Sequence, residues 1–210
     1  MARNRGATCR LCRREGKKLF LKGQKCNSPK CVFEKKGYAP GMFADDRRRR
    51  RPSDYALQLR EKQKMKTAYG LLERQFRRYV RQAERRDGVT SQLLVQALEC
   101  RLDNVVWRAG LAVSRAQARQ IVGHRHITVN DRIVNIPSFA VRPGDVIKVR
   151  EKSRQIVPIA QALANAGAVV PPEWLQVDLE NATVTAIGLP EPDKIDTGAD
   201  EQQVIEFYSR

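Results

Sequence analysis

The stretch from 99 to 152 most constrains the fold of this 210-residue chain, because its hydrophobic periodicity changes from helical to alternating. One helix is expected to run into this stretch and to end where Gly110 interrupts the apolar pattern. Ser114, followed three residues later by Gln117, is a capping-box pattern that predicts the start of a second helix. Gly123 can end that helix in a left-handed conformation. The stretch is therefore predicted to begin with two consecutive helices.

Three short strands are predicted to follow the helices. The runs 127–129 and 133–136 flank a turn at Asn130-Asp131, two residues that tolerate the positive φ of a tight hairpin. A third strand, 146–149, follows the turn signal Pro143-Gly144-Asp145. The predicted unit is thus α-α-β-β-β, with positive charge at one end.

The start of the second helix combines features that suit an anion. Arg115 and Arg119 are four residues apart and share a helix face. The N-terminus beside Ser114 exposes N–H groups and the positive end of the helix dipole. Arg101 and Arg108 come from the preceding helix and its end. A solvated charged face is the plain alternative, but the coincidence of these features favours a phosphate-binding surface.

A family resemblance is carried by the run RLDNVVWRAGLAVSRAQARQIV, which begins at Arg101. This run resembles the RNA-binding module of the S4 family of small-subunit ribosomal proteins. The segments REGKKLFLKG, PSDYALQLREKQK, LLERQFRRYV and EQQVIEFYSR resemble the same family, in the form that keeps four cysteines. Membership would implicate Arg101, Ser114, Arg115, Gln117 and Arg119 in RNA contact.

The resemblance also implies a function. A member of this family would be a structural, non-catalytic protein that binds folded small-subunit ribosomal RNA early in assembly. Its partners would include neighbouring small-subunit ribosomal proteins, with an effect on translational accuracy, and no small-molecule substrate. Such a protein would work in the ribosome, in the cytoplasm.

The charge of the chain supports a polyanionic partner. The formal net charge is +17, and it is uneven, with +19 over residues 1–86, +5 over 87–154 and −7 over 155–210. Such a balance fits nucleic acid or an acidic membrane. The longest apolar stretch, 156–170, is broken by polar residues and is too short to span a bilayer. The basic N-terminus has no signal-peptide pattern. We therefore expect nucleic acid and no membrane.

Four cysteines near the N-terminus have the spacing C-x2-C-x13-C-x4-C, and they are Cys9, Cys12, Cys26 and Cys31. Two such pairs suit one structural, tetrahedral Zn²⁺ ion, because short spacers let each pair chelate the same metal. An iron–sulfur cluster is the minor alternative. The fifth, Cys100, is expected to be a small buried residue on the first helix of the central module.

The segment after the cysteines is strongly basic. The run Arg47, Arg48, Arg49, Arg50 and Arg51 is expected to stay extended and to contact RNA, and the family resemblance suggests messenger RNA at its entry path. Ser53 is a predicted N-cap for a helix with Tyr55 on its inner side. The next helix has an apolar stripe from Leu72 to Ala83. Candidate RNA-binding residues off this stripe are Arg74, Arg77, Arg78 and Arg81.

The C-terminal third completes an α+β fold. A short helix is expected at 156–163, and the runs 175–179 and 183–187 are predicted to extend the central sheet, which would be mixed or antiparallel. Asp200 is a predicted N-cap for a last helix that docks on the helical pair at 54–86. The predicted domains are a zinc knuckle with its arginine-rich linker at 1–52, a helical domain at 53–90 with 199–210, and an RNA-binding module at 91–198.

Two other classes of protein compete with this interpretation. RNA-modifying or tRNA-charging enzymes can carry a similar module, but the sequence has no G-x-x-x-x-G-K-[ST] nucleotide loop, and its two histidines lie inside the module. A zinc-dependent DNA regulator would be expected to show a Cys₂His₂ finger or a helix-turn-helix pattern. The residues favour a structural RNA-binding protein over both.

Overall fold

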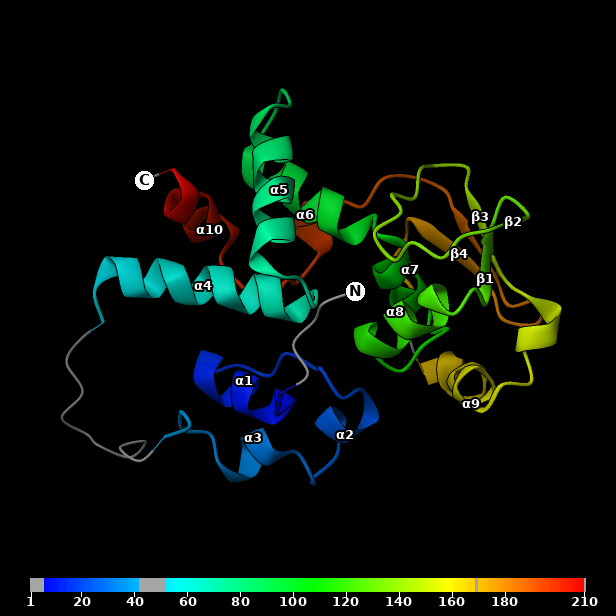
Figure 1. The fold of residues 1–210 in the computed structure, drawn as a ribbon, viewed down its shortest axis with the longest axis horizontal. Helices are drawn as coiled ribbons and strands as arrows, with labels where there is room; N and C mark the ends of the chain where they lie inside the picture. Colours follow the sequence, from blue (N-terminus) through cyan, green and yellow to red (C-terminus); the bar gives the residue numbers. More distant parts are fainter. Residues whose placement is uncertain (1–5, 42–51, 169, 210) are drawn as a thin grey trace. The chain divides into compact units, whose positions relative to one another are not determined.

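The computed structural model describes residues 6–41, 52–168 and 170–209 (Figure 1). The chain forms two compact units, the first comprising residues 1–95 with 195–210 and the second residues 96–194. The first unit is discontinuous, because the C-terminal segment returns to it. The finer division into three domains, with boundaries at 52, 90 and 198, stays a prediction. None of the described helices is long and apolar enough to cross a membrane.

The first unit is helical. Its helices are α1 (Thr8–Glu15), α2 (Gln24–Asn27), α3 (Val32–Lys35), α4 (Asp54–Ala68), α5 (Glu73–Glu84) and α10 (Glu201–Tyr208), and α6 (Thr90–Glu99) leads out of it. The predicted caps are confirmed, since Ser53 Oγ accepts from the Ala56 N–H at 3.3 Å and Asp200 accepts from the Gln203 N–H at 3.2 Å.

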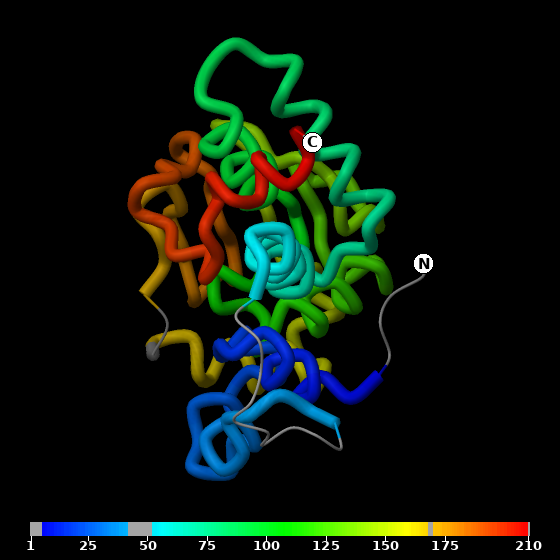
Figure 2. Tube along the Cα trace, turned by 90° about the vertical axis from the view of Figure 1, so that its left-hand side faces the viewer, coloured from blue at the N-terminus to red at the C-terminus, as the bar shows by residue number. Residues whose placement is uncertain are grey.

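Helices α4, α5 and α10 share an apolar core. Figures 1 and 2 show α10 packed against α4, as predicted for the last helix. Met65, Phe76 and Val204 are each 0% exposed there. One expectation was wrong, because Leu72 precedes α5 as its N-cap and is 42% exposed. Tyr55 is 51% exposed, but its ring faces α10, with its centroid 5.5 Å from that of Phe207.

A polar cluster ties α10 to the same two helices. The Tyr208 hydroxyl donates to Glu73 Oε1 at 2.6 Å, and Lys62 Nζ donates to Glu73 Oε2 at 2.9 Å. The Lys62 ammonium also lies 4.7 Å from the centroid of the Phe207 ring, which adds a cation–π contact. Burial alone would raise the pKa of Glu73, but hydrogen bonds from Tyr208, Lys62 and Lys66 outweigh it and lower that pKa to about 2.

This cluster predicts an acid-sensitive contribution to stability. A carboxyl group whose pKa is lower in the folded than in the unfolded state stabilises the fold above its unfolded pKa. The contribution of Glu73 is therefore complete above about pH 4.5 and is lost as the pH falls toward 2. The Glu73 side chain is 46% exposed, so solvent screening reduces the effect to about 1 kcal/mol. Urea unfolding of Glu73→Gln and wild type should differ near pH 7 and converge near pH 2. Tyr208→Phe should show a smaller difference with the same pH dependence, and a gap that is constant with pH would contradict the assignment.

The second unit contains a five-stranded antiparallel sheet with order β2-β1-β3-β5-β4. Its strands are β1 (Ile127–Val129), β2 (Arg132–Ile133), β3 (Val146–Val149), β4 (Leu175–Asp178) and β5 (Thr183–Ala186). Its helices are α7 (Leu102–Arg108), α8 (Arg115–Gly123) and α9 (Val157–Asn165), with short 3₁₀ turns at Glu151–Ser153, Ala166–Ala168 and Pro192–Lys194. The pairing of β3 with β5 confirms that the last two strands extend the central sheet.

Helices α7 and α8 pack on this sheet through one hydrophobic core. Leu102, Val106, Val122, Ile147 and Val184 are all 0% exposed members of it. Alternating burial along β3 and β5 shows that each strand turns one face to the helices. The core therefore fixes where α8 begins, next to the end of α7.

The single helix expected up to Gly110 is instead two helices, α6 and α7. The break occurs at Arg101, which forms an isolated antiparallel bridge with Ala140. Backbone bonds from Val141 N–H to Cys100 O and from Leu102 N–H to Phe139 O complete this interruption. Cys100 is buried as expected, but it lies at the break and not on a continuous helix. Helical periodicity could not reveal the break, because the partner strand is about 40 residues away in sequence.

Of the two left-handed positions predicted from the sequence, the hairpin turn is confirmed and the helix end is not. Asn130 and Asp131 have φ of 49° and 61°, as predicted for the hairpin turn between β1 and β2. Gly123, however, is a helical residue of α8, and Arg125, with φ of 66°, takes the left-handed position after it. Strand β2 ends at Ile133, three residues before the predicted end.

Candidate nucleic-acid interface

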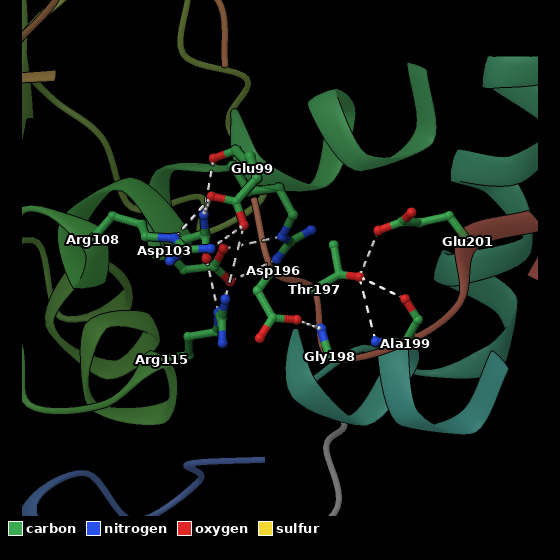
Figure 3. Close-up of polar contacts among 11 residues, drawn as sticks. Glu99, Asp103, Arg108, Arg115, Asp196, Thr197, Gly198, Ala199 and Glu201 are labelled. Carbon is green, nitrogen blue, oxygen red and sulfur yellow. Dashed lines mark hydrogen bonds and ion pairs between the residues drawn. The ribbon is translucent and has the colours of Figure 1, made fainter. Parts of the chain in front are cut away.

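A buried carboxylate organises the arginines near the start of α8 (Figure 3). Glu99 is 0% exposed, and its two oxygens accept from Arg108 Nε and Nη2, both at 3.0 Å. Asn104 Nδ2 donates to Glu99 Oε2 at 2.8 Å. Arg115 donates from Nε to Asn104 Oδ1 at 2.8 Å, and its Nη2 lies 3.9 Å from Glu99 Oε1. Two guanidinium groups are thus fixed around one carboxylate.

Asp103 forms a second centre in the same unit. Its Oδ1 accepts from Arg101 Nε at 3.0 Å, and its Oδ2 accepts from Arg101 Nη2 at 2.6 Å and from Arg119 Nη1 at 3.0 Å. Arg101 is 1% exposed, so the structure places this predicted RNA-binding residue in the interior. The side chain of Arg119 remains 12% exposed. Arg101 therefore supports Asp103 from within, whereas Arg119 lies toward the surface.

The Trp107 ring packs against the guanidinium groups of two arginines. The guanidinium carbon of Arg115 lies 3.8 Å from the Trp107 ring centroid, and that of Arg108 lies 5.0 Å away. The side chains of Arg108 and Arg115 keep 24% and 17% of their surface exposed. The cluster of four guanidinium groups and two carboxylates carries two excess positive charges at the N-terminus of α8.

Ser114 and Gln117 form that N-terminus, as the capping pattern predicts. Ser114 Oγ accepts from the Gln117 N–H at 3.3 Å. The Gln117 side chain, however, reaches one residue further back than in a capping box and accepts from the Val113 N–H at 2.6 Å. Both side chains are thus occupied in holding the helix start. Their observed role is to hold the start of α8 in place.

A second basic surface lies on α5. Phe76, Tyr79, Val80 and Ala83 face the core of the first unit. The four predicted RNA-binding arginines of this helix are all exposed, and they are Arg74, Arg77, Arg78 and Arg81. The amphipathic pattern therefore separates a packing face from an arginine face. The predicted contacts of Arg47 to Arg51 lie outside the described residues.

The four N-terminal cysteines lie on or next to α1, α2 and α3. Cys12, Cys26 and Cys31 are buried, and Cys9 is partly exposed. Burial raises the pKa of the Cys12 thiol, and Cys26, Cys9 and Cys31 raise it further, against a backbone hydrogen bond at Leu19 that lowers it. Four thiolates brought into one site would repel one another unless a cation neutralised them.

The chemistry of these donors suits zinc, and the Lys22 N–H donates to Cys26 Sγ at 3.4 Å. Nevertheless, within the described residues no group of three or more His, Cys, Asp or Glu side chains is arranged so that it could hold a metal ion. The side chains would therefore have to move closer together around an ion.

Two family models match this chain, and they meet near the first boundary between the two units. Residues 3–99 match the family model described as the ribosomal protein S4/S9 N-terminal domain, and residues 100–147 match the S4 domain. The chain is 52% identical to the small ribosomal subunit protein uS4 of Natranaerobius thermophilus, 53% to that of Thermus thermophilus and 56% to uS4A of Symbiobacterium thermophilum. Each alignment covers 100% of both chains. The chain belongs to the uS4 family of small ribosomal subunit proteins.

Membership in the uS4 family confirms the family named from the sequence. It makes this chain a structural ribosomal protein that binds ribosomal RNA, and not an enzyme. Both arginine centres lie in or beside the segment that matches the S4 domain.

Sequence reasoning identified the arginines of this site but missed the groups that hold them, namely Glu99, Asp103, Asn104 and Trp107. A signal was present, because Glu99 and Asp103 are four residues apart, with Arg101 between them. Because the helix breaks at Arg101, Glu99 and Asp103 do not share one helix face, as a spacing of four would otherwise indicate. Only the tertiary structure brings these acidic groups under the arginines.

Proposed function

We propose that this chain binds one folded form of small-subunit ribosomal RNA through the arginine cluster at the start of α8 and the arginine face of α5. The observation that carries the proposal is the cluster itself, in which partly exposed guanidinium groups are held by buried carboxylates. Arginine suits phosphate, because its planar fork donates two parallel hydrogen bonds. Arginines in a fixed arrangement bind phosphates at a matching spacing, which selects a folded RNA by its shape.

The biological role that follows is early organisation of the small subunit. A protein that binds a folded RNA stabilises that fold, because it binds the folded and not the unfolded state. We include contacts with neighbouring small-subunit proteins, an influence on translational accuracy, and contact of Arg47 to Arg51 with RNA, including messenger RNA. The charge run supports the last of these, since five consecutive arginines favour a phosphate backbone.

We also propose that Cys9, Cys12, Cys26 and Cys31 bind one structural Zn²⁺ ion, with an iron–sulfur cluster as the minor alternative. The spacing of the four residues and the burial of three of them support this proposal. The bound ion would neutralise the thiolates and hold α1, α2 and α3 together. Its role would be structural, because four protein ligands leave no open position.

RNA binding by Arg115→Gln tests the main proposal. The wild-type protein should bind small-subunit ribosomal RNA at near-physiological salt in the presence of excess transfer RNA. Arg115→Gln should weaken this binding by about tenfold or more and reduce the salt slope by about one, because one phosphate contact is lost. Lys194→Gln removes the same charge from a side chain that is 56% exposed and paired with Glu173, and it should bind like wild type. Wild-type binding that transfer RNA abolishes would exclude recognition of one folded RNA.

A further inference from the structure

Glu99 cannot act on RNA by direct contact. Its side chain is 0% exposed, and its negative charge would repel a phosphate. A buried carboxylate also costs several kcal/mol of desolvation unless it is paired and hydrogen-bonded. Glu99 receives that compensation from Arg108 and Asn104, with Arg115 Nη2 3.9 Å away. Any effect of Glu99 on RNA binding must therefore pass through these neighbours.

The contacts of Glu99 restrict the motion of the two arginines. Arg108 is held by two parallel bonds of 3.0 Å, which fix both the position and the plane of its guanidinium group. Arg115 is held through Asn104 on one side and by the Trp107 ring, 3.8 Å from its guanidinium carbon, on another. A free arginine side chain carries about 2 kcal/mol of rotamer entropy. Because these side chains are ordered before RNA arrives, binding loses less entropy.

Glu99 also reduces the positive charge of the site. The cluster has four guanidinium groups and two carboxylates, and removing the charge of Glu99 would raise the net charge of the site by one. More positive charge strengthens binding to any phosphate backbone, whatever its fold. The carboxylate thus opposes general attraction while it orders the groups that make specific contacts.

From these contacts we propose that Glu99 is a positioning residue that makes the arginine cluster selective for one folded RNA over other RNA. This inference rests on the proposed function, which supplies the RNA. The buried carboxylate holds Arg108 and Arg115 at fixed positions, and it limits the excess charge that would bind unrelated RNA. Selectivity and total affinity are therefore expected to respond to Glu99 in opposite directions.

Glu99→Gln tests this inference, because it keeps the size of the side chain and removes its charge. Binding of the full-length protein to small-subunit ribosomal RNA and to transfer RNA is measured separately across a range of salt concentrations. Glu99→Gln should bind ribosomal RNA about tenfold or more weakly, a change that corresponds to about 1.4 kcal/mol. Its affinity for transfer RNA should stay the same or rise. The matched control Glu173→Gln removes the same charge from a side chain that is 79% exposed, and it should leave the ratio of the two affinities unchanged.

Arg108→Lys provides a second test if Glu99→Gln does not fold, as judged by circular dichroism. Lysine keeps the positive charge but cannot form the two parallel bonds to Glu99. The variant should lose selectivity with little change in the salt slope. Equal loss of affinity for both RNAs, or no loss for either, would overturn the positioning role. If the wild type shows no preference for ribosomal RNA, the proposed function fails first, and the inference fails with it.

Discussion

Replacing Cys12 with serine is expected to abolish metal binding and to disorder residues 6–41. This segment has little apolar core of its own, with Leu19 among its few buried large residues, so the proposed metal would be its main source of stability. Structural zinc contributes about 10–16 kcal/mol in isolated zinc-finger peptides at neutral pH. Elemental analysis should find about one Zn²⁺ per wild-type chain and almost none in Cys12→Ser. Limited proteolysis should cleave the variant within the segment much faster than wild type.

Cys100→Ser is the matched control for this experiment. Cys100 is also buried, but it lies in the second unit, at the break between α6 and α7. The variant should keep its metal and the protection of residues 6–41. A wild-type protein purified without chelator that holds neither zinc nor iron would overturn the metal site. Iron with a visible absorption band would support the iron–sulfur alternative.

Replacing Phe76 with alanine is expected to lower the free energy of unfolding of the first unit by about 3–5 kcal/mol. Phe76 is 0% exposed, and its ring centroid lies 6.1 Å from that of Tyr208 on the C-terminal helix. Truncation removes the burial of a large ring and leaves a cavity between α5 and α10. The lower free energy of unfolding should be measurable by urea denaturation monitored by circular dichroism. Because the chain has two units, the shift is expected in the transition that reports the first unit.

Leu72→Ala tests whether burial causes the effect of Phe76→Ala. Leu72 is only four residues away, but it is 42% exposed and caps the same helix. It should lower the free energy of unfolding by less than about 1 kcal/mol, as expected for surface positions. Similar losses in both variants would contradict the assigned core.

Physical patterns that act over a few residues could be read from the sequence. The caps at Ser53, Ser114 and Asp200 were predicted, because each side chain accepts from a backbone N–H three residues away. The Asn130-Asp131 turn was predicted for the same reason, since its conformation depends on those two residues. The apolar stripe of α5 likewise gave its buried face and its exposed arginine face. The family resemblance supplied ribosomal RNA as the partner, which spacing alone could not name.

What the tertiary structure decided depends on groups that are distant in sequence. Arg101 was expected at the surface, but the bridge to Ala140 breaks the helix there and turns its side chain inward to Asp103. Glu99 acquires its role because the break lets α7 and α8 bring Arg108 and Arg115 to one carboxylate. The sequence by itself determined which residues carry positive charge and where helices begin. Only packing determined which of those charges are buried, paired and fixed, because burial and pairing depend on all neighbours in space.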